Sequence, residues 1–415
     1  MLKVLSINTF EKVGGAARSV VRLHHGLQDV GVEASLVVQY KSSSENSVIG
    51  PSTVFERMVN FFRPYLDALP VLLYRSRLDP PWSVSWLSKN INKTLSNDVL
   101  DIVHLHWINY GFLSIRDIAR IDKPIVWTLH DSWPFTGGCN LPGNCRRYQD
   151  SCGSCPQLNS FSYNDLSHWI WEQKHKYWRF LNLTVVTPSR WLAECSRSST
   201  LFRDVRIEVI PNGIDTDVYK AIDRQIAREK LSLPQQKTLL MFGAANYIKD
   251  RNKGFEIFLK ALDLLAVNGW GEKVDVILFG AKNNPKLPQT GFTTHCFGEI
   301  KKEEELVLLY SAADLFVLPS IQENLPNTVI ESMACSTPCV AFSIGGLPDI
   351  IDHKMNGYLA EPFSIQDLAD GICWSISDIE RHCDLSRWAR EKIELEFDVK
   401  LVAKRYLNLY MEIMS

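Results

Sequence analysis

Short apolar runs that alternate with amphipathic helical patterns constrain the fold of this chain more than any other feature. Runs such as Ile102–Leu105 and Leu315–Leu318 are flanked by segments with apolar residues at helical spacing, such as Phe255–Val267. Strands that alternate with helices along a chain are typical of parallel β-sheets covered by helices. The sequence therefore predicts an α/β fold.

The alternation occurs twice, which indicates two Rossmann-like halves. Strands are expected in the first half at 2–7, 34–38, 102–105, 125–129, 184–187 and 206–210, and in the second half at 238–242, 274–279, 294–297, 315–318 and 339–342. A chain of 415 residues is also too long for one ordinary hydrophobic core. We predict an N-terminal domain over 1–212, a C-terminal domain over 213–400, and a last helix over 401–415 that packs back on the first domain.

Composition excludes several classes of protein. The formal net charge of −2 and the lack of a basic stripe argue against a nucleic-acid partner. The best candidate for a membrane span, residues 65–74, is interrupted by Asp67 and Pro70. No small-residue cleavage site follows the first apolar stretch, so we expect a buried strand there and not a signal peptide. Cysteines scattered singly among apolar residues favour buried thiols in a reducing cytoplasm.

The strongest local signal is Glu323-Asn-Leu-Pro-Asn-Thr-Val-Ile-Glu331, which follows the predicted strand 315–318 directly. Pro326 suits the start of a helix, and the N–H groups of a helix start form an anion site fit for a diphosphate. A carboxylate on each side can accept hydrogen bonds from sugar and ribose hydroxyls. The pattern is equally compatible with a helix whose start simply favours acidic residues.

Several ordered motifs carry a resemblance to a known family. They are the two glutamates Glu323 and Glu331, the later Gly345-Gly346-Leu-Pro-Asp349, the pair Gly14-Gly15, the segment Pro211-Asn-Gly-Ile-Asp215 and the pair Lys253-Gly254. Over nearly its whole length the chain resembles the retaining glycosyltransferases of family 4, also called group 1. Its four-cysteine insert is similar to the exopolysaccharide and colanic-acid subgroup. The resemblance implies the GT-B fold, in which two Rossmann-like domains face an inter-domain cleft.

The resemblance also implies a reaction. A sugar would pass from a nucleoside diphosphate sugar to a hydroxyl of a lipid-linked saccharide acceptor in polysaccharide biosynthesis, with its anomeric configuration retained. The N-terminal domain would bind the acceptor and the C-terminal domain the donor. The leaving phosphate would take the acceptor proton, so rate would come from positioning and charge stabilisation. No Asp-x-Asp motif follows a strand, so no catalytic metal is expected.

Family roles transfer to matching positions of this sequence. Glu323 would bind hydroxyls of the donor sugar, Glu331 the ribose, and Lys253 the leaving diphosphate. His130 would contact the donor sugar, and His130, Glu323 and Lys253 form the predicted catalytic set. The remaining predicted donor-site residues are Gly14, Gly15, Asn324, Leu325, Asn327 and Thr328, and those on the acceptor side are Asp131 and Trp133.

Some positions depart from the family pattern or allow a plainer interpretation. The usual arginine after the first C-terminal strand is missing, and Arg251 or Lys249 could replace it. Asn324 and Leu325 stand where glycines are common, which leaves the donor sugar open. Gly14-Gly15 also fits an ordinary strand-to-helix turn, and His104 and His106 are expected to be structural or rim residues.

Four cysteines lie close together in the sequence, within an insert over 137–158. Cys139, Cys145, Cys152 and Cys155 end in a Cys-x-x-Cys motif among glycine-rich turns, a spacing that favours a structural zinc ion bound by four thiolates. Two disulfides are the alternative, which a reducing compartment disfavours.

Two stretches combine aromatic and basic residues, over 55–86 and 168–179. Such residues are typical of peripheral membrane contact, here at the inner face of the plasma membrane. Ordinary helix packing with a solvated basic face is the alternative, and it is favoured on sequence alone.

Two other functional classes share this scaffold. One is a sugar-nucleotide epimerase or a phosphorylase, and the other is a non-catalytic carbohydrate-binding protein. An epimerase would change the donor without an acceptor, and a binding protein would release no nucleoside diphosphate.

Overall fold

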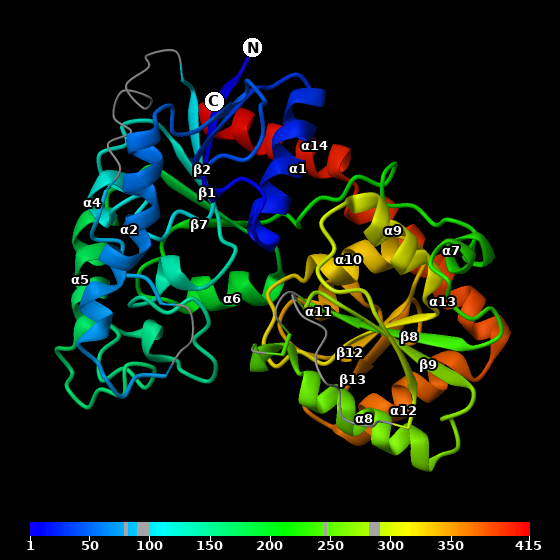
Figure 1. Ribbon diagram of the computed structural model, residues 1–415. Coiled ribbons are helices and arrows are strands. Elements are labelled where there is room, and N and C mark those ends of the chain that lie inside the picture. Colours follow the sequence, from blue (N-terminus) through cyan, green and yellow to red (C-terminus); the bar gives the residue numbers. More distant parts are fainter. Residues whose placement is uncertain (79–81, 89–99, 245–246, 249, 282–290) are drawn as a thin grey trace. The chain divides into compact units, whose positions relative to one another are not determined.

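The computed structural model describes residues 1–78, 82–88, 100–244, 247–248, 250–281 and 291–415. These residues form two compact units, labelled by element in Figure 1. Unit 1 comprises Met1–Gly213 together with Lys400–Ser415, and unit 2 comprises Ile214–Val399. Each unit is built on its own parallel sheet, which confirms the predicted α/β class with two Rossmann-like domains.

Seven parallel strands form the sheet of unit 1, in the order β3-β2-β1-β4-β5-β6-β7. Their bounds are β1 (Lys3–Phe10), β2 (Glu33–Tyr40), β3 (Val48–Ile49), β4 (Ile102–Leu105), β5 (Ile125–Thr128), β6 (Leu183–Thr187) and β7 (Arg206–Val209). β1 lies between β2 and β4, since Val4 pairs with both Ala34 and Ile102. The strand order reverses between β1 and β4, and ligands of such sheets bind beyond the carboxyl ends of the strands at this switch point.

Helices cover both faces of this sheet. They are α1 (Gly15–Asp29), α2 (Val54–Leu72), α4 (Ile115–Ile118), α5 (Leu166–Trp178), α6 (Arg190–Ser198) and α14 (Val399–Met414). The last helix, red in Figure 1, lies beside α1. Its Val402, Tyr406 and Tyr410 are buried in one apolar cluster with Leu23 of α1 and Val126 of β5. The C-terminal residues thereby complete the core of unit 1.

Six parallel strands form the sheet of unit 2, in the order β10-β9-β8-β11-β12-β13. Their bounds are β8 (Thr238–Gly243), β9 (Val274–Phe279), β10 (Thr293–Cys296), β11 (Leu315–Leu318), β12 (Cys339–Phe342) and β13 (Gly357–Ala360). The helices are α7 (Arg224–Lys230), α8 (Phe255–Val267), α9 (Glu303–Ala312), α10 (Asn327–Ala334), α11 (Leu347–Ile350), α12 (Ile365–Ile376) and α13 (Ile379–Glu396). The order reverses between β8 and β11, so the switch point of this unit lies there.

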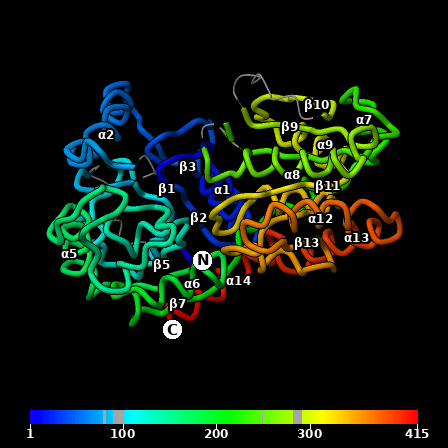
Figure 2. Tube along the Cα trace, turned by 90° about the horizontal axis from the view of Figure 1, so that it is seen from below, coloured from blue at the N-terminus to red at the C-terminus, as the bar shows by residue number. Residues whose placement is uncertain are grey.

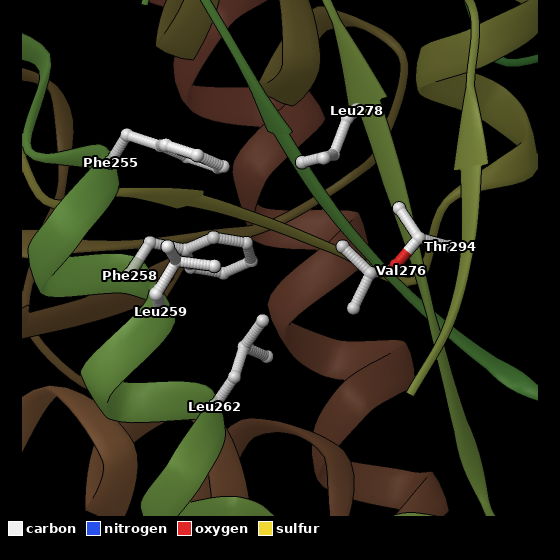
Figure 3. Close-up of a pocket in the computed structure, with 7 residues that line it drawn as sticks. All are labelled: Phe255, Phe258, Leu259, Leu262, Val276, Leu278 and Thr294. Carbon is white, nitrogen blue, oxygen red and sulfur yellow. The ribbon is translucent and has the colours of Figure 1, made fainter. Parts of the chain in front are cut away.

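Helix α8 shows how the apolar spacing of the sequence becomes core. Phe258 and Leu262 point from the helix toward Val276 and Leu278 of β9 (Figure 3). They leave a cavity of about 10 Å³, the size of a single water molecule. This space is therefore part of the core and too small for a ligand.

The strands β3 and β13 were not predicted from the sequence. β3 has only two residues, and β13 begins with Gly357, which weakens the strand pattern. Among the described helices, none is both long and apolar enough to cross a membrane.

Candidate active site

Three loops meet at the carboxyl ends of β8, β11 and β12 in unit 2. Ile321 N–H donates to Asn252 O at 2.8 Å, and Asn252 Nδ2 donates to Gln322 O at 2.8 Å. These bonds tie the loop after β8 to the loop after β11 on both sides of the switch point. Asn252 was not predicted from the sequence, because a single asparagine in a turn gives no signal of a long-range partner.

Two glycines allow the close approach of these loops. Gly254 has φ +71°, and a Cβ there would lie 1.9 Å from Pro319 O. Gly345 has φ +53°, and a Cβ there would lie 1.8 Å from Glu323 O. Any other residue at either position would push away the loop that carries Glu323.

Lys253 and Glu323 form an ion pair at the centre of this arrangement. Lys253 Nζ lies 2.7 Å from Glu323 Oε1, and both side chains are partly buried. Burial by itself lowers the pKa of Lys253, but the Glu323 carboxylate outweighs burial and the net pKa is raised. Lys253 is therefore a fixed cation at the switch point, and it orients the carboxylate beside it.

Helix α10 begins immediately after this pair. Pro326 occupies its N-cap position and has no side-chain acceptor to offer, and Asn327 and Thr328 follow in the first turn. Val329 and Ile330 are fully buried and anchor the helix. Leu325 is also buried, so its side chain belongs to the core while its backbone lies in the loop. The amide end of α10 thus faces the region of Glu323, where it favours an anion.

Glu331 lies inside α10 and away from the loop surface. Its side chain is only 1% exposed, and its Oε2 accepts a hydrogen bond from Tyr310 at 3.2 Å. The predicted contact with ribose stays a prediction, and it requires a hydroxyl to reach a carboxylate that already has a protein donor.

Arg251 and Lys249 were the two candidates to replace the arginine that the family usually has after its first C-terminal strand. Arg251 lies in the turn Arg251–Lys253, and its side chain is exposed. Lys249, the other candidate for the second cation, lies outside the described residues.

In unit 1, Gly14 and Gly15 connect β1 to α1. Gly14 has φ +90° and stands at the N-cap position of α1. A Cβ at Gly14 would meet nothing within 4 Å in the described part of the chain, so backbone conformation alone favours glycine there.

His130 follows β5 and contacts a second histidine. His106 Nδ1 lies 3.2 Å from His130 Nε2. His104, two residues before His106, lies 2.8 Å from Thr128 Oγ1 through Nε2 and 2.7 Å from the Tyr410 hydroxyl through Nδ1. His104 and His106 are both buried, so they are interior residues and not rim residues. Contact between His106 and His130 could not be predicted, because it depends on the neighbouring positions of β4 and β5.

Burial keeps these histidines neutral. It lowers the pKa of His130 to about 4 and that of His104 to about 3, and it holds the pKa of His106 well below its ordinary value. His106 and His130 border a cavity of about 10 Å³, together with Asn212 and Tyr406. Within the described residues, His106 Nε2 has no hydrogen-bond partner, although the atom is buried.

Asp131 serves as an anchor for the loop after β5. It accepts hydrogen bonds from Trp107 Nε1 at 2.7 Å, from Trp133 N at 2.9 Å and from Asn140 Nδ2 at 2.5 Å. Burial raises the pKa of Asp131, although these donors act in the opposite direction. The carboxylate is thus already occupied by the protein.

Trp133 lies in the core of unit 1, and its predicted place on the acceptor side stays a prediction. Its side chain is 1% exposed, and its indole donates to Ser83 O at 2.9 Å. Lys174 of α5 lies above the ring, 3.7 Å from its centroid, and donates to the carbonyls of Trp133 and Thr136. Burial lowers the pKa of Lys174 to about 7. The sequence placed Lys174 in a basic stretch and gave no sign that it is buried.

The predicted zinc site is not supported. In the described residues, which include Cys139, Cys145, Cys152 and Cys155, no group of three or more potential ligands gathers around a common point. All four are free thiols in the structure, and Cys139 lies in a β-bridge with Trp82. Cys152 Sγ instead accepts a hydrogen bond from Gly137 N at 3.2 Å, and burial raises the pKa of Cys152 to about 12.

Comparison with known proteins identifies the class. Residues 236–378 match the family model described as "Glycosyl transferases group 1", and residues 13–218 match "Glycosyltransferase Family 4". The chain is therefore a glycosyltransferase, a transferase of sugar groups. More narrowly, its two domains are those of the group 1, family 4 type.

Characterised and named relatives agree with this assignment. The N-acetyl-alpha-D-glucosaminyl L-malate synthase of Bacillus anthracis is 25% identical over 368 residues, 84% of each chain. The putative colanic acid biosynthesis glycosyl transferase WcaC of Escherichia coli is 25% identical over 358 residues, 82% of this chain and 83% of the relative.

Solved structures share the fold. Sucrose-phosphate synthase from Thermosynechococcus elongatus has a TM-score of 0.69 at 17% identity and covers 100% of this chain and 99% of its own. Anabaena HepE, solved in complex with UDP, has a TM-score of 0.64 at 16% identity. The match covers 99% of this chain and 100% of the HepE chain. These likenesses confirm the GT-B class of fold, with its two Rossmann-like domains.

Proposed function

We propose that this chain transfers a sugar from a nucleoside diphosphate sugar to a hydroxyl of a saccharide, with retention of anomeric configuration. The observation that carries the proposal is the Lys253–Glu323 ion pair, held beside the amide end of α10 at the switch point of unit 2. This arrangement offers a cation and oriented N–H groups for a diphosphate, and a carboxylate for sugar hydroxyls. HepE, a structure of the same fold, was solved with UDP and with UDP-glucose.

In this proposal unit 2 binds the donor. Lys253 stabilises the charge that develops on the leaving diphosphate, and the backbone at Asn324, Leu325, Asn327 and Thr328 approaches its phosphates. Glu323 accepts hydrogen bonds from the donor sugar, and Glu331 from the ribose. Fixed charges of this kind lower the barrier because they need no rearrangement when the bond to the phosphate breaks.

Unit 1 supplies the acceptor side. The same unit offers Gly14 and Gly15 at the start of α1, and His130 after β5, to the donor. Since His130 is neutral, it can donate or accept a hydrogen bond toward a sugar hydroxyl without introducing charge. Asp131 acts by fixing the loop that follows. The inter-domain cleft expected from the family stays a prediction.

The acceptor is proposed to be a lipid-linked saccharide used in polysaccharide biosynthesis at the cytoplasmic face of a membrane. The name of the WcaC relative supports this setting, since it refers to colanic acid biosynthesis. Membrane proximity follows if the acceptor carries a lipid.

The test begins with a thermal-shift screen of nucleoside diphosphate sugars on the full chain. A donor that binds should raise the melting temperature by mass action. Glu323→Gln should abolish the shift, and Glu256→Gln, which alters an acidic residue of the neighbouring helix α8, should retain it. A shift that survives Glu323→Gln would overturn the assigned site.

Release of nucleoside diphosphate then distinguishes a glycosyltransferase from an epimerase and from a carbohydrate-binding protein. Release that depends on a saccharide acceptor supports transfer. Conversion of the donor without any acceptor would indicate an epimerase, and binding without release under all acceptors would indicate a carbohydrate-binding protein. Nuclear magnetic resonance of the anomeric proton in the product tests retention.

A further inference from the structure

Helix α2 presents its apolar side outward. Its exposed apolar residues recur at helical spacing and form one stripe along the helix, which we call the α2 stripe: Val54, Phe55, Met58, Phe61, Phe62, Tyr65, Leu66, Leu69, Leu72 and Leu73 at its end. Phe55, Phe61 and Tyr65 are 68%, 59% and 64% exposed. Figure 2 shows α2 on the outside of its unit.

The inner side of α2 carries polar groups along most of its length, and Val71 near its end packs in the core of unit 1. Asn60 Nδ2 donates to Gln39 O at 2.9 Å, and Arg63 Nη1 donates to Gly111 O at 3.0 Å. Asp67 accepts hydrogen bonds from Ser85 N at 3.2 Å and Trp86 N at 3.1 Å. The helix is therefore attached by polar groups, the reverse of an ordinary surface helix, which buries its apolar side.

Exposing the apolar side of α2 to water is unfavourable in free energy. Exposed aliphatic and aromatic side chains stabilise nothing until they leave water, at roughly 25 cal/mol per Å² of surface removed. A continuous apolar stripe on a folded domain usually marks a surface that contacts a membrane or a partner. The exposure of the α2 stripe therefore indicates that it contacts a membrane or a partner.

The charged residues near the α2 stripe indicate which kind of surface it contacts. Arg57, in the first turns of the helix, and Arg75, just after its end, are both exposed. The carboxylates of the same segment are engaged by the protein, since Glu56 accepts from Ser52 N at 2.7 Å and Asp67 is buried. Apolar and aromatic side chains flanked by available cations match an anionic lipid surface.

The second aromatic and basic stretch does not have this organisation. In α5, Ile170, Lys174 and Trp178 are buried in the domain. Exposed cations remain at its end, at Lys176 and Arg179, but they flank no apolar stripe. The structure therefore separates two stretches that look alike in sequence.

We propose that the α2 stripe is the surface through which the enzyme binds an anionic lipid bilayer, lying parallel to it with the aromatic rings among the headgroups. This inference deepens the proposed function, since it names the contact that would bring unit 1 to a lipid-linked acceptor. The N-terminal domain then holds the membrane contact and the acceptor side in one unit.

The test is co-sedimentation of the full chain with vesicles of phosphatidylcholine alone or with phosphatidylglycerol added. The unmodified chain should sediment with the anionic vesicles, and the variant F61E/L69E should lose binding by about tenfold or more. The matched control F161E/F180E changes two other exposed apolar residues of unit 1 by the same charge and should bind normally. R57Q/R75Q should weaken binding to anionic vesicles, while K176Q/R179Q should not.

Three results would overturn the proposal. They are equal sedimentation with neutral vesicles, unchanged binding of F61E/L69E, and a dimer of the unmodified chain that F61E/L69E dissociates in light-scattering chromatography without any vesicle binding. The last result would assign the stripe to an interface between copies. Donor-induced thermal shifts on the same preparations show that each variant is folded, and they test the donor site independently of the membrane contact.

Discussion

At the scale of single residues, the Lys253–Glu323 pair should behave as one unit. Each partner orients the other at 2.7 Å, so removing either disrupts both. We expect Lys253→Met to lower kcat by about 10²–10³-fold, the range for losing one group that stabilises developing charge. Glu323→Gln should lower kcat by a similar factor, and the double variant should lower kcat little further than either single variant. Fully additive losses in steady-state kinetics, or an equal loss in the surface control Lys260→Met, would contradict a coupled pair.

Gly345 gives a second residue-level prediction. Gly345→Ala places a Cβ against Glu323 O, whereas Gly269→Ala has a similar positive φ of +81° but nothing near the new Cβ. Gly269→Ala should cost about 1 kcal/mol from backbone strain alone. Gly345→Ala should cost more and should also weaken donor binding, because it displaces the loop of Glu323. Equal urea midpoints for the two variants would show that the contact with Glu323 is unimportant.

Some of these residues could be recognised from the sequence and others could not. Glu323 lies in a loop that directly follows a predicted strand, and Lys253 was identified through the resemblance to the family. His106 and Lys174 gave no such signal. Their partners lie on neighbouring strands or in a distant loop, and only the folded chain brings them together.

At the scale of elements, α14 should stabilise unit 1 through its tyrosines as well as its apolar face. Tyr410 binds His104 Nδ1 at 2.7 Å, and Tyr406 binds Thr128 Oγ1 at 2.8 Å. Tyr410→Phe leaves a buried imidazole nitrogen without this partner, which should cost about 1–3 kcal/mol of unfolding free energy. Tyr65→Phe, which removes a hydroxyl from an exposed residue, is the matched control. Unchanged stability of Tyr410→Phe in urea would mean that this bond contributes nothing.

Element boundaries followed the apolar pattern where that pattern was strong. The strands Ile102–Leu105, Val274–Phe279 and Cys339–Phe342 begin and end where they were predicted. The orientation of α2 was not predictable in this way. Helical spacing identifies an apolar side, but which side faces the domain depends on polar partners such as Gln39 and Gly111, which are distant in sequence.

At the scale of the whole molecule, buried histidines should make stability depend on pH. His104, His106 and His130 lie together in unit 1, and burial depresses the pKa of each, to about 3 for His104 and about 4 for His130. An unfolded histidine takes up a proton near pH 6.5, while the folded ones stay neutral. Below that pH the unfolded chain therefore binds more protons, and stability falls as pH falls.

The expected loss is large enough to measure. Each histidine contributes up to about 1.4 kcal/mol per pH unit once the unfolded form is protonated, so the three together should cost about 5 kcal/mol between pH 6.5 and 5. Asp131, whose pKa is raised by burial, acts in the opposite direction, which confines a clean measurement to pH above 5. Urea unfolding at pH 7, 6 and 5 should show a falling midpoint, and His106→Gln should reduce the slope, because one titrating group is gone. A midpoint that stays level or rises on acidification would mean that these histidines are solvated and charged in the folded chain, and the neutral His130 of the proposed sugar contact would then have to be abandoned.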